Sequence, residues 1–138
     1  MKHHISISLA LLAAAAASTA AAQDMAAGAK LARETVDLIS LQDHMMVTAI
    51  RQKNDRKGAA DYQRFILDPI ARLSDQWTAQ PPTVKVHYVV CATALQEHEN
   101  HARDSFKAGQ IGKPSSLRGQ AVETCRALIG HTSGAAQR

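Results

Sequence analysis

The stretch CATALQEHENHARDSFKAGQIGKPSSLRGQAVETC, residues 91–125, contains the only two cysteines of the chain, one at each end. Apolar residues recur at helical spacing before and after a break at residues 109–114. A bond between Cys91 and Cys125 would therefore join the last two helices of a small protein and close a long loop. The predicted fold is organised around this pair.

The first 22 residues have the three-part pattern of a secretory signal peptide. Residues 1–4 include the basic Lys2, Ile5–Ala17 is apolar and uncharged, and Ala20–Ala22 supplies the small residues that a signal peptidase requires. The apolar run is shorter than the roughly 20 residues that span a bilayer, which favours a cleaved signal over a membrane anchor. We expect a single mature domain, residues 23–138, in the periplasm or secreted, without a transmembrane segment.

Charge and composition narrow the function classes. Loss of Lys2 leaves 15 basic residues against 12 acidic ones, a net charge of +3. An exported chain meets little nucleic acid, so the mild positive charge favours an acidic partner or an anionic surface instead. The five aromatic residues predict a thin core, which a disulfide would stabilise.

Two helices are expected before the cysteine segment. Residues 31–50 carry a broad apolar stripe after a frayed start at 23–30, and a polar connection follows that ends at Gly58. Residues 59–77 have the clearest amphipathic pattern, formed by Tyr62, Phe65, Ile66, Ile70, Leu73 and Trp77. Pro69 interrupts this pattern and predicts either a kink at Asp68 or two short helices that share one buried face.

Residues 84–90 allow two interpretations. They alternate as in a strand, but a single strand has no partner in this chain. We favour one helix that starts after Pro81-Pro82 and continues through Phe106, and the strand is the alternative. A last helix begins at Ser115 or Ser116 and ends at Gly130, before a loose tail from about residue 131. Its expected buried face contains Leu117, Ala121, Val122, Cys125, Leu128 and Ile129.

The predicted fold is thus all-α: a small four-helix bundle, with its second helix kinked at Pro69 and its last two helices joined by a disulfide. In an exported protein an even pair of cysteines predicts a disulfide. An ideal helical hairpin would place Cys91 and Cys125 at heights that differ by about 10 Å, whereas a disulfide needs Cα atoms within about 7 Å. The connection at 108–115 would have to run back along the bundle to remove this difference.

A cluster of titratable residues lies between the cysteines. His98 and His101, with Glu97, share one side of a helix and form a candidate site for a transition metal or haem, which His44 would complete from the first helix. The favoured interpretation is that these are ordinary polar-face histidines, so no cofactor is expected. The zinc-protease, covalent-haem and phosphate-loop patterns are absent from the sequence.

No catalytic constellation stands out, which disfavours an enzyme. The predicted function is an exported binding protein that acts by protein–protein interaction, such as an inhibitor or immunity protein or an accessory subunit of an envelope machine. Its partner would be another exported or envelope protein. The segment 97–113 is the expected binding surface, with contacts from Glu99, Lys107 and Lys113. The sequence leaves both a monomer and a helix-packed homodimer open.

Overall fold

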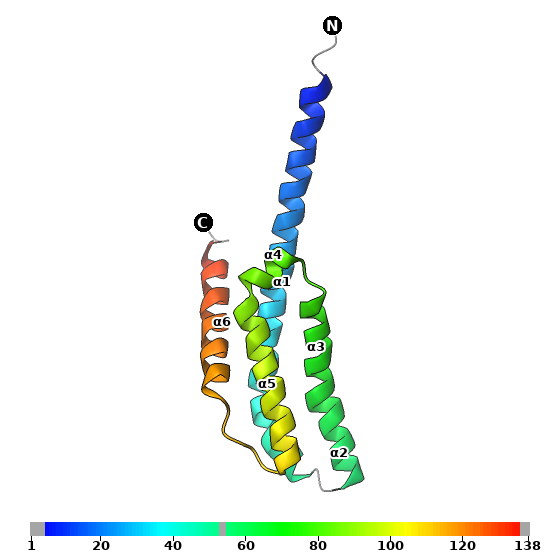
Figure 1. The fold of residues 1–138 in the computed structure, drawn as a ribbon, viewed down its shortest axis with the longest axis vertical. Helices are drawn as coiled ribbons and strands as arrows, with labels where there is room; N and C mark the ends of the chain where they lie inside the picture. Colours follow the sequence, from blue (N-terminus) through cyan, green and yellow to red (C-terminus); the bar gives the residue numbers. More distant parts are fainter. Residues whose placement is uncertain (1–4, 53–54, 136–138) are drawn as a thin grey trace.

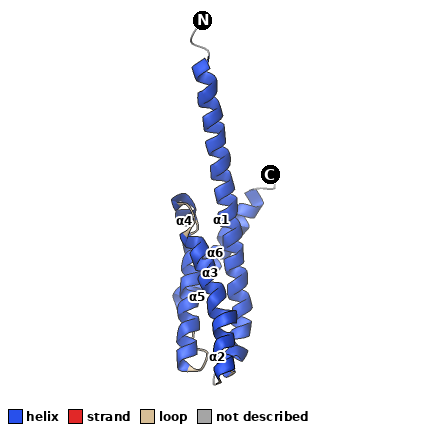
Figure 2. Ribbon diagram, turned by 90° about the vertical axis from the view of Figure 1, so that its right-hand side faces the viewer, coloured by secondary structure: helices blue, strands red, loops and turns tan. Residues whose placement is uncertain are grey.

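The computed structural model describes the backbone of residues 5–52 and 55–135, and side-chain burial for residues 18–52 and 55–131. Within these ranges the chain is helical and has no strand (Figures 1 and 2). The elements are α1 (Ile5–Arg51), α2 (Arg56–Tyr62), a π-helix η1 (Gln63–Leu67), α3 (Asp68–Thr78), α4 (Pro82–His87), α5 (Val89–Ala108) and α6 (Ser116–Ala135). The prediction of an all-α fold is confirmed.

The bundle consists of four long helical rods: α1, the run α2–η1–α3, α5 and α6. The second rod counts as one because α2, η1 and α3 follow one another without a break. α5 packs against α6, α1 and α3, and α1 also contacts α6 and α3. The short α4 is an additional helix that the sequence prediction did not separate from α5. Among the most deeply buried side chains of the core are Tyr62, Ile66, Ile70, Val84, Tyr88 and Cys91.

α1 extends well beyond the bundle at its N-terminal end (Figure 1). The expected frayed start at 23–30 is wrong, since the helix is continuous there. Residues 18–24 are exposed, and the first buried residues are Gly28 and Ala29. The predicted signal-peptide boundary therefore falls in the projecting part of α1, before the bundle begins. Among the residues described, no helix is long and apolar enough to cross a bilayer.

Gly28 allows α1 to approach α4 closely. A Cβ atom at this position would lie 2.5 Å from Val84 Cγ1 and 2.9 Å from Tyr88 Cε2, and both of these side chains are buried. A larger residue would therefore have to push the α4–α5 junction away from α1.

We expect Gly28→Ala to lower the free energy of unfolding by about 1 kcal/mol, because overpacking of about 1–3 kcal/mol outweighs the gain in helix propensity. The matched control is Gly119→Ala on α6, where a Cβ atom would meet nothing within 4 Å. That change should raise the unfolding free energy by up to about 1 kcal/mol. Urea titration of both variants measures the difference, and equal effects would contradict the close approach.

The interruption at Pro69 takes the form of a π-helical turn. Proline has no N–H group, so the carbonyl of Phe65, four residues earlier, loses its usual helical partner. Gln42 Nε2 donates to that carbonyl at 3.2 Å and to the carbonyl of Ile66 at 2.9 Å. The wide turn also rotates Phe65 out of the buried stripe, where it had been predicted, and leaves it 47% exposed.

The segment after Pro81 is helical, as favoured, but it is not one helix. The backbone at Tyr88, with φ −105° and ψ 22°, separates α4 from α5. The strand alternative is wrong: Val84 and Tyr88, four residues apart, are buried, while Val86 is 76% exposed. The expected end at Gly130 is also wrong, because α6 continues to Ala135; glycine costs an exposed helix only about 1 kcal/mol.

The Cys91–Cys125 disulfide is confirmed, with its Cα atoms 5.0 Å apart. α5 ends at Gly109, which has the left-handed conformation with φ 73°. The connection between α5 and α6 then runs back along the bundle before α6 begins at Ser116 (Figure 1). This return removes the difference in height expected for an ideal hairpin. The disulfide thus fixes the middle of α6 against the N-terminal turn of α5.

Candidate functional site

A recess of about 520 Å³ lies between the C-terminal half of α5 and the connection to α6. It is lined mostly by polar residue types from both segments: Glu97, Asn100, His101, Asp104, Ser105, Ala108, Gly112, Lys113 and Ser115. This is the same stretch of chain that the sequence indicated as a binding surface. The recess, rather than the whole helix face, is the candidate site.

Hydrogen bonds from α5 hold the connection in place. The Gly112 N–H group donates to Ser105 Oγ at 3.2 Å, and Ser115 Oγ donates to Glu97 Oε2 at 2.8 Å. Ser115 also caps α6, since its Oγ accepts from the Arg118 N–H group at 3.1 Å. The wall of the recess is therefore anchored near both of its ends.

The three predicted contact residues, Glu99, Lys107 and Lys113, do not lie together in the recess. Lys113 lines the recess together with Glu97 and His101. Glu99 does not: it forms an ion pair with Arg103 at 2.7 Å and lines a separate cavity of about 350 Å³ between α3 and α5. Lys107 is exposed in the last turn of α5, outside the lining of the recess.

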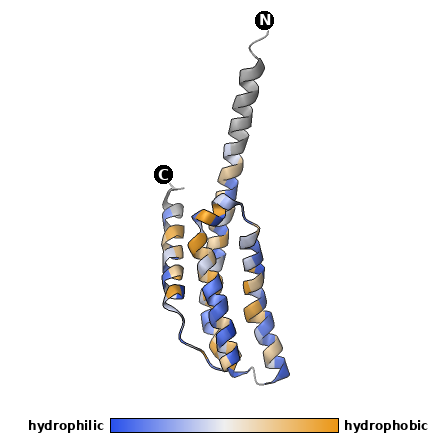
Figure 3. Ribbon diagram, viewed as in Figure 1, coloured by the Kyte–Doolittle hydropathy of each residue, from blue (hydrophilic) through white to orange (hydrophobic). Residues whose placement is uncertain are grey.

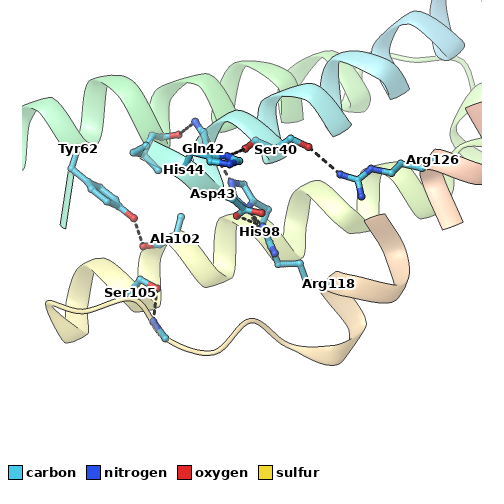
Figure 4. Close-up of polar contacts among 12 residues, drawn as sticks. Ser40, Gln42, Asp43, His44, Tyr62, His98, Ala102, Ser105, Arg118 and Arg126 are labelled. Atoms are coloured by element: carbon cyan, nitrogen blue, oxygen red, sulfur yellow. Dashed lines mark hydrogen bonds and ion pairs between the residues drawn. The ribbon is translucent and has the colours of Figure 1, made fainter. Parts of the chain in front are cut away.

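His98 is fully buried in a polar network that joins four helical elements (Figure 4). Its Nδ1 atom accepts from Arg118, 3.0 Å from the terminal nitrogen and 3.3 Å from Nε. Arginine can only donate, so the ring proton is on Nε2, which donates to Gln42 Oε1 at 2.9 Å. Gln42 in turn donates to the π-helical turn. The network thus ties α1, α5, α6 and η1 together.

Charge in this network is carried by Arg118 and Asp43. Arg118 is nearly buried and donates to Asp43 Oδ1 in an ion pair. Asp43 Oδ1 also lies 3.9 Å from His98 Nδ1, but His98 is neutral, because burial and the adjacent guanidinium lower its pKa to about 4. Burial and Arg118 likewise lower the pKa of His101.

The candidate metal ligands are only partly brought together. Glu97 and His101 both line the recess, whereas both ring nitrogens of His98 are engaged in hydrogen bonds. His44 donates from Nδ1 to the Ser40 carbonyl oxygen at 2.8 Å and lines a different cavity. Within the residues described, no group of three or more His, Cys, Asp or Glu side chains is arranged to hold a metal ion.

Sequence reasoning missed Gln42, Asp43 and Arg118. The available signal was a polar residue at a position of the apolar stripe: Gln42 is three residues after Ile39 and four before Met46, both buried. On α6 the expected face is correct from Ala121 to Ile129 and wrong only at its first residue, Leu117. Leu117 is 50% exposed, and Arg118 occupies the buried position instead.

Comparison of the chain with protein-family models, with curated proteins and with solved structures gave no match.

Proposed function

We propose that the protein is an exported, non-enzymatic binding protein that engages another exported or envelope protein through the recess between α5 and the α5–α6 connection. The observation that carries this proposal is the recess itself: it has a volume of about 520 Å³, is lined mostly by polar residues, and has a loop wall that is anchored on α5 by two hydrogen bonds. A fixed loop wall lowers the ordering cost of binding.

Three features support the exported location. The first 22 residues have the signal-peptide pattern. Residues 18–24 are exposed and the bundle begins after them, so cleavage after Ala22 would leave the described core intact. A disulfide persists in oxidising compartments such as the periplasm. An inhibitor, an immunity protein or an accessory subunit of an envelope machine fits this size and location.

The proposal is tested by affinity capture from the exported protein fraction of the source cell, with oxidised residues 23–138 as bait. Lys113→Glu changes the charge of a lining residue and should reduce capture of the partner about tenfold or more. The matched control is Arg72→Glu, an exposed position on α3 away from the recess, which should leave capture unchanged. Equal capture by both variants would exclude the recess as the binding site.

A further inference from the structure

The net positive charge of the mature chain is concentrated in one segment. Residues 51–64 contain five basic and two acidic residues, a net charge of +3, which equals that of residues 23–138; the remainder is balanced. The described residues of this segment, 51–52 and 55–64, lie at the lower end of the bundle, where the start of α2 is hydrophilic (Figure 3). The charge is thus a local property of the end where α1 meets α2.

Both acidic residues of this segment are already engaged. Asp55 is the N-cap of α2 and accepts from the Gly58 N–H group, and Asp61 pairs with Lys57 at 2.5 Å. Arg56 and Lys57 lie in the first turn of α2, where positive charge opposes the helix dipole. Lys57 offsets this through its ion pair with Asp61, but its side chain is still 84% exposed, and Arg56 is exposed as well. Both basic groups are therefore accessible to an outside partner.

A groove with an apolar floor lies beside these charges. It has a volume of about 430 Å³ between α1 and the α2–η1 rod, and its lining includes Met45, Thr48, Ala49, Asp61 and Phe65. Phe65 is 47% exposed because the π-helical turn rotates it outward. The Arg64 guanidinium lies over the ring of Phe65, 5.3 Å from its centroid, and Lys57 forms an ion pair with Asp61. Because Phe65 and Asp61 line the groove, both cations lie at its edge.

We propose that this groove binds an acidic amphipathic helix of a partner protein. Two neighbouring rods form a channel into which a third helix packs its apolar face. Met45 and Phe65 offer adaptable and aromatic contact area for that face. The carboxylates flanking it would pair with Lys57 and Arg64. This surface is separate from the recess on α5, so the inference does not depend on what the recess binds.

The experiment uses a fluorescein-labelled helical peptide with leucines along one face and glutamates on both flanks, and a second peptide with lysines in place of the glutamates. Binding to residues 23–138 is followed by fluorescence anisotropy at low salt. We expect the glutamate peptide to bind at least about tenfold more tightly than the lysine peptide. The double variant K57E/R64E should reverse that order, and Phe65→Ser should weaken binding of the glutamate peptide about tenfold.

Matched controls separate groove binding from general charge effects. K30E/R33E changes the same number of charges on α1, including a lysine that also pairs with an acid four residues on. Leu117→Ser removes an apolar side chain that is 50% exposed on α6. Both controls should leave the preference for the glutamate peptide unchanged, and Lys113→Glu should do so as well, which keeps this test independent of the recess.

Three results would overturn the inference. The first is equal binding of the two peptides, or an order that K57E/R64E does not reverse. The second is self-association of residues 23–138 that Phe65→Ser abolishes, because the occupant would then be a second copy of the chain. The third is co-sedimentation with phosphatidylglycerol vesicles that K57E/R64E abolishes while peptide binding is undetectable, because the partner would then be an anionic membrane.

Discussion

Removal of the disulfide by the double change C91A/C125A is expected to lower the free energy of unfolding by about 3–4 kcal/mol. The bond closes a segment whose ends are 34 residues apart in sequence, so its loss restores much conformational freedom to the unfolded chain. Both cysteines are fully buried between α5, α6 and α1, and the alanines would add a small cavity cost. Urea unfolding followed by circular dichroism measures the change.

The reduced wild-type chain is the control for this prediction. It keeps the side chains but lacks the bond, so its unfolding midpoint should fall close to that of C91A/C125A. Because the sulfur atoms are buried, dithiothreitol should reduce the folded protein slowly and the urea-unfolded protein rapidly. A double variant as stable as the oxidised protein would show that α6 is held by packing alone.

Acidification from pH 6.5 to 4 is expected to cost about 3 kcal/mol of stability through His98. The pKa of this imidazole is lowered from 6.5 to about 4 in the folded protein, chiefly by burial and then by Arg118. Between these values the unfolded chain binds more protons than the folded one, so stability rises with pH across this window. The contribution is complete above pH 6.5 and is lost as the pH falls toward 4.

His98→Gln isolates this effect. A glutamine can still accept from Arg118 and donate to Gln42, but it does not titrate. The variant should therefore lose the part of the pH dependence that belongs to His98, whereas His87→Gln at an exposed position should retain it. Equal losses of stability between pH 6.5 and 4 in the wild type and in His98→Gln would contradict the conclusion that His98 is buried in its neutral form.

The sequence was sufficient for the elements that depend on local patterns. Three of them lie in short stretches: the apolar spacing of residues 59–77, the Pro81-Pro82 boundary and the Ser115 cap. The structure agrees with each of them, except that Phe65 is 47% exposed. The cysteine pairing was also accessible, because two cysteines allow only one bond within the chain. These features need no knowledge of which helix packs against which.

The features that were missed depend on contacts between distant segments. Gln42 acquires its role only because Pro69 leaves the Phe65 carbonyl without a helical partner, 23 residues away in sequence. Arg118 is buried where it meets His98 and Asp43, so it takes the buried position in the first turn of α6 that was expected for Leu117. Tyr88, where α4 and α5 are divided, likewise lies beside Gly28 on α1, a neighbour that is 60 residues away in sequence.

The most direct test of the account is the intact mass of the untagged protein recovered from the exported fraction of its source cell, together with metal analysis. An exported, disulfide-joined binding protein predicts the mass of residues 23–138 less two protons, without a stoichiometric metal. A mass that retains residues 1–22 with both thiols free, or a chain that carries one metal ion per molecule, would contradict it.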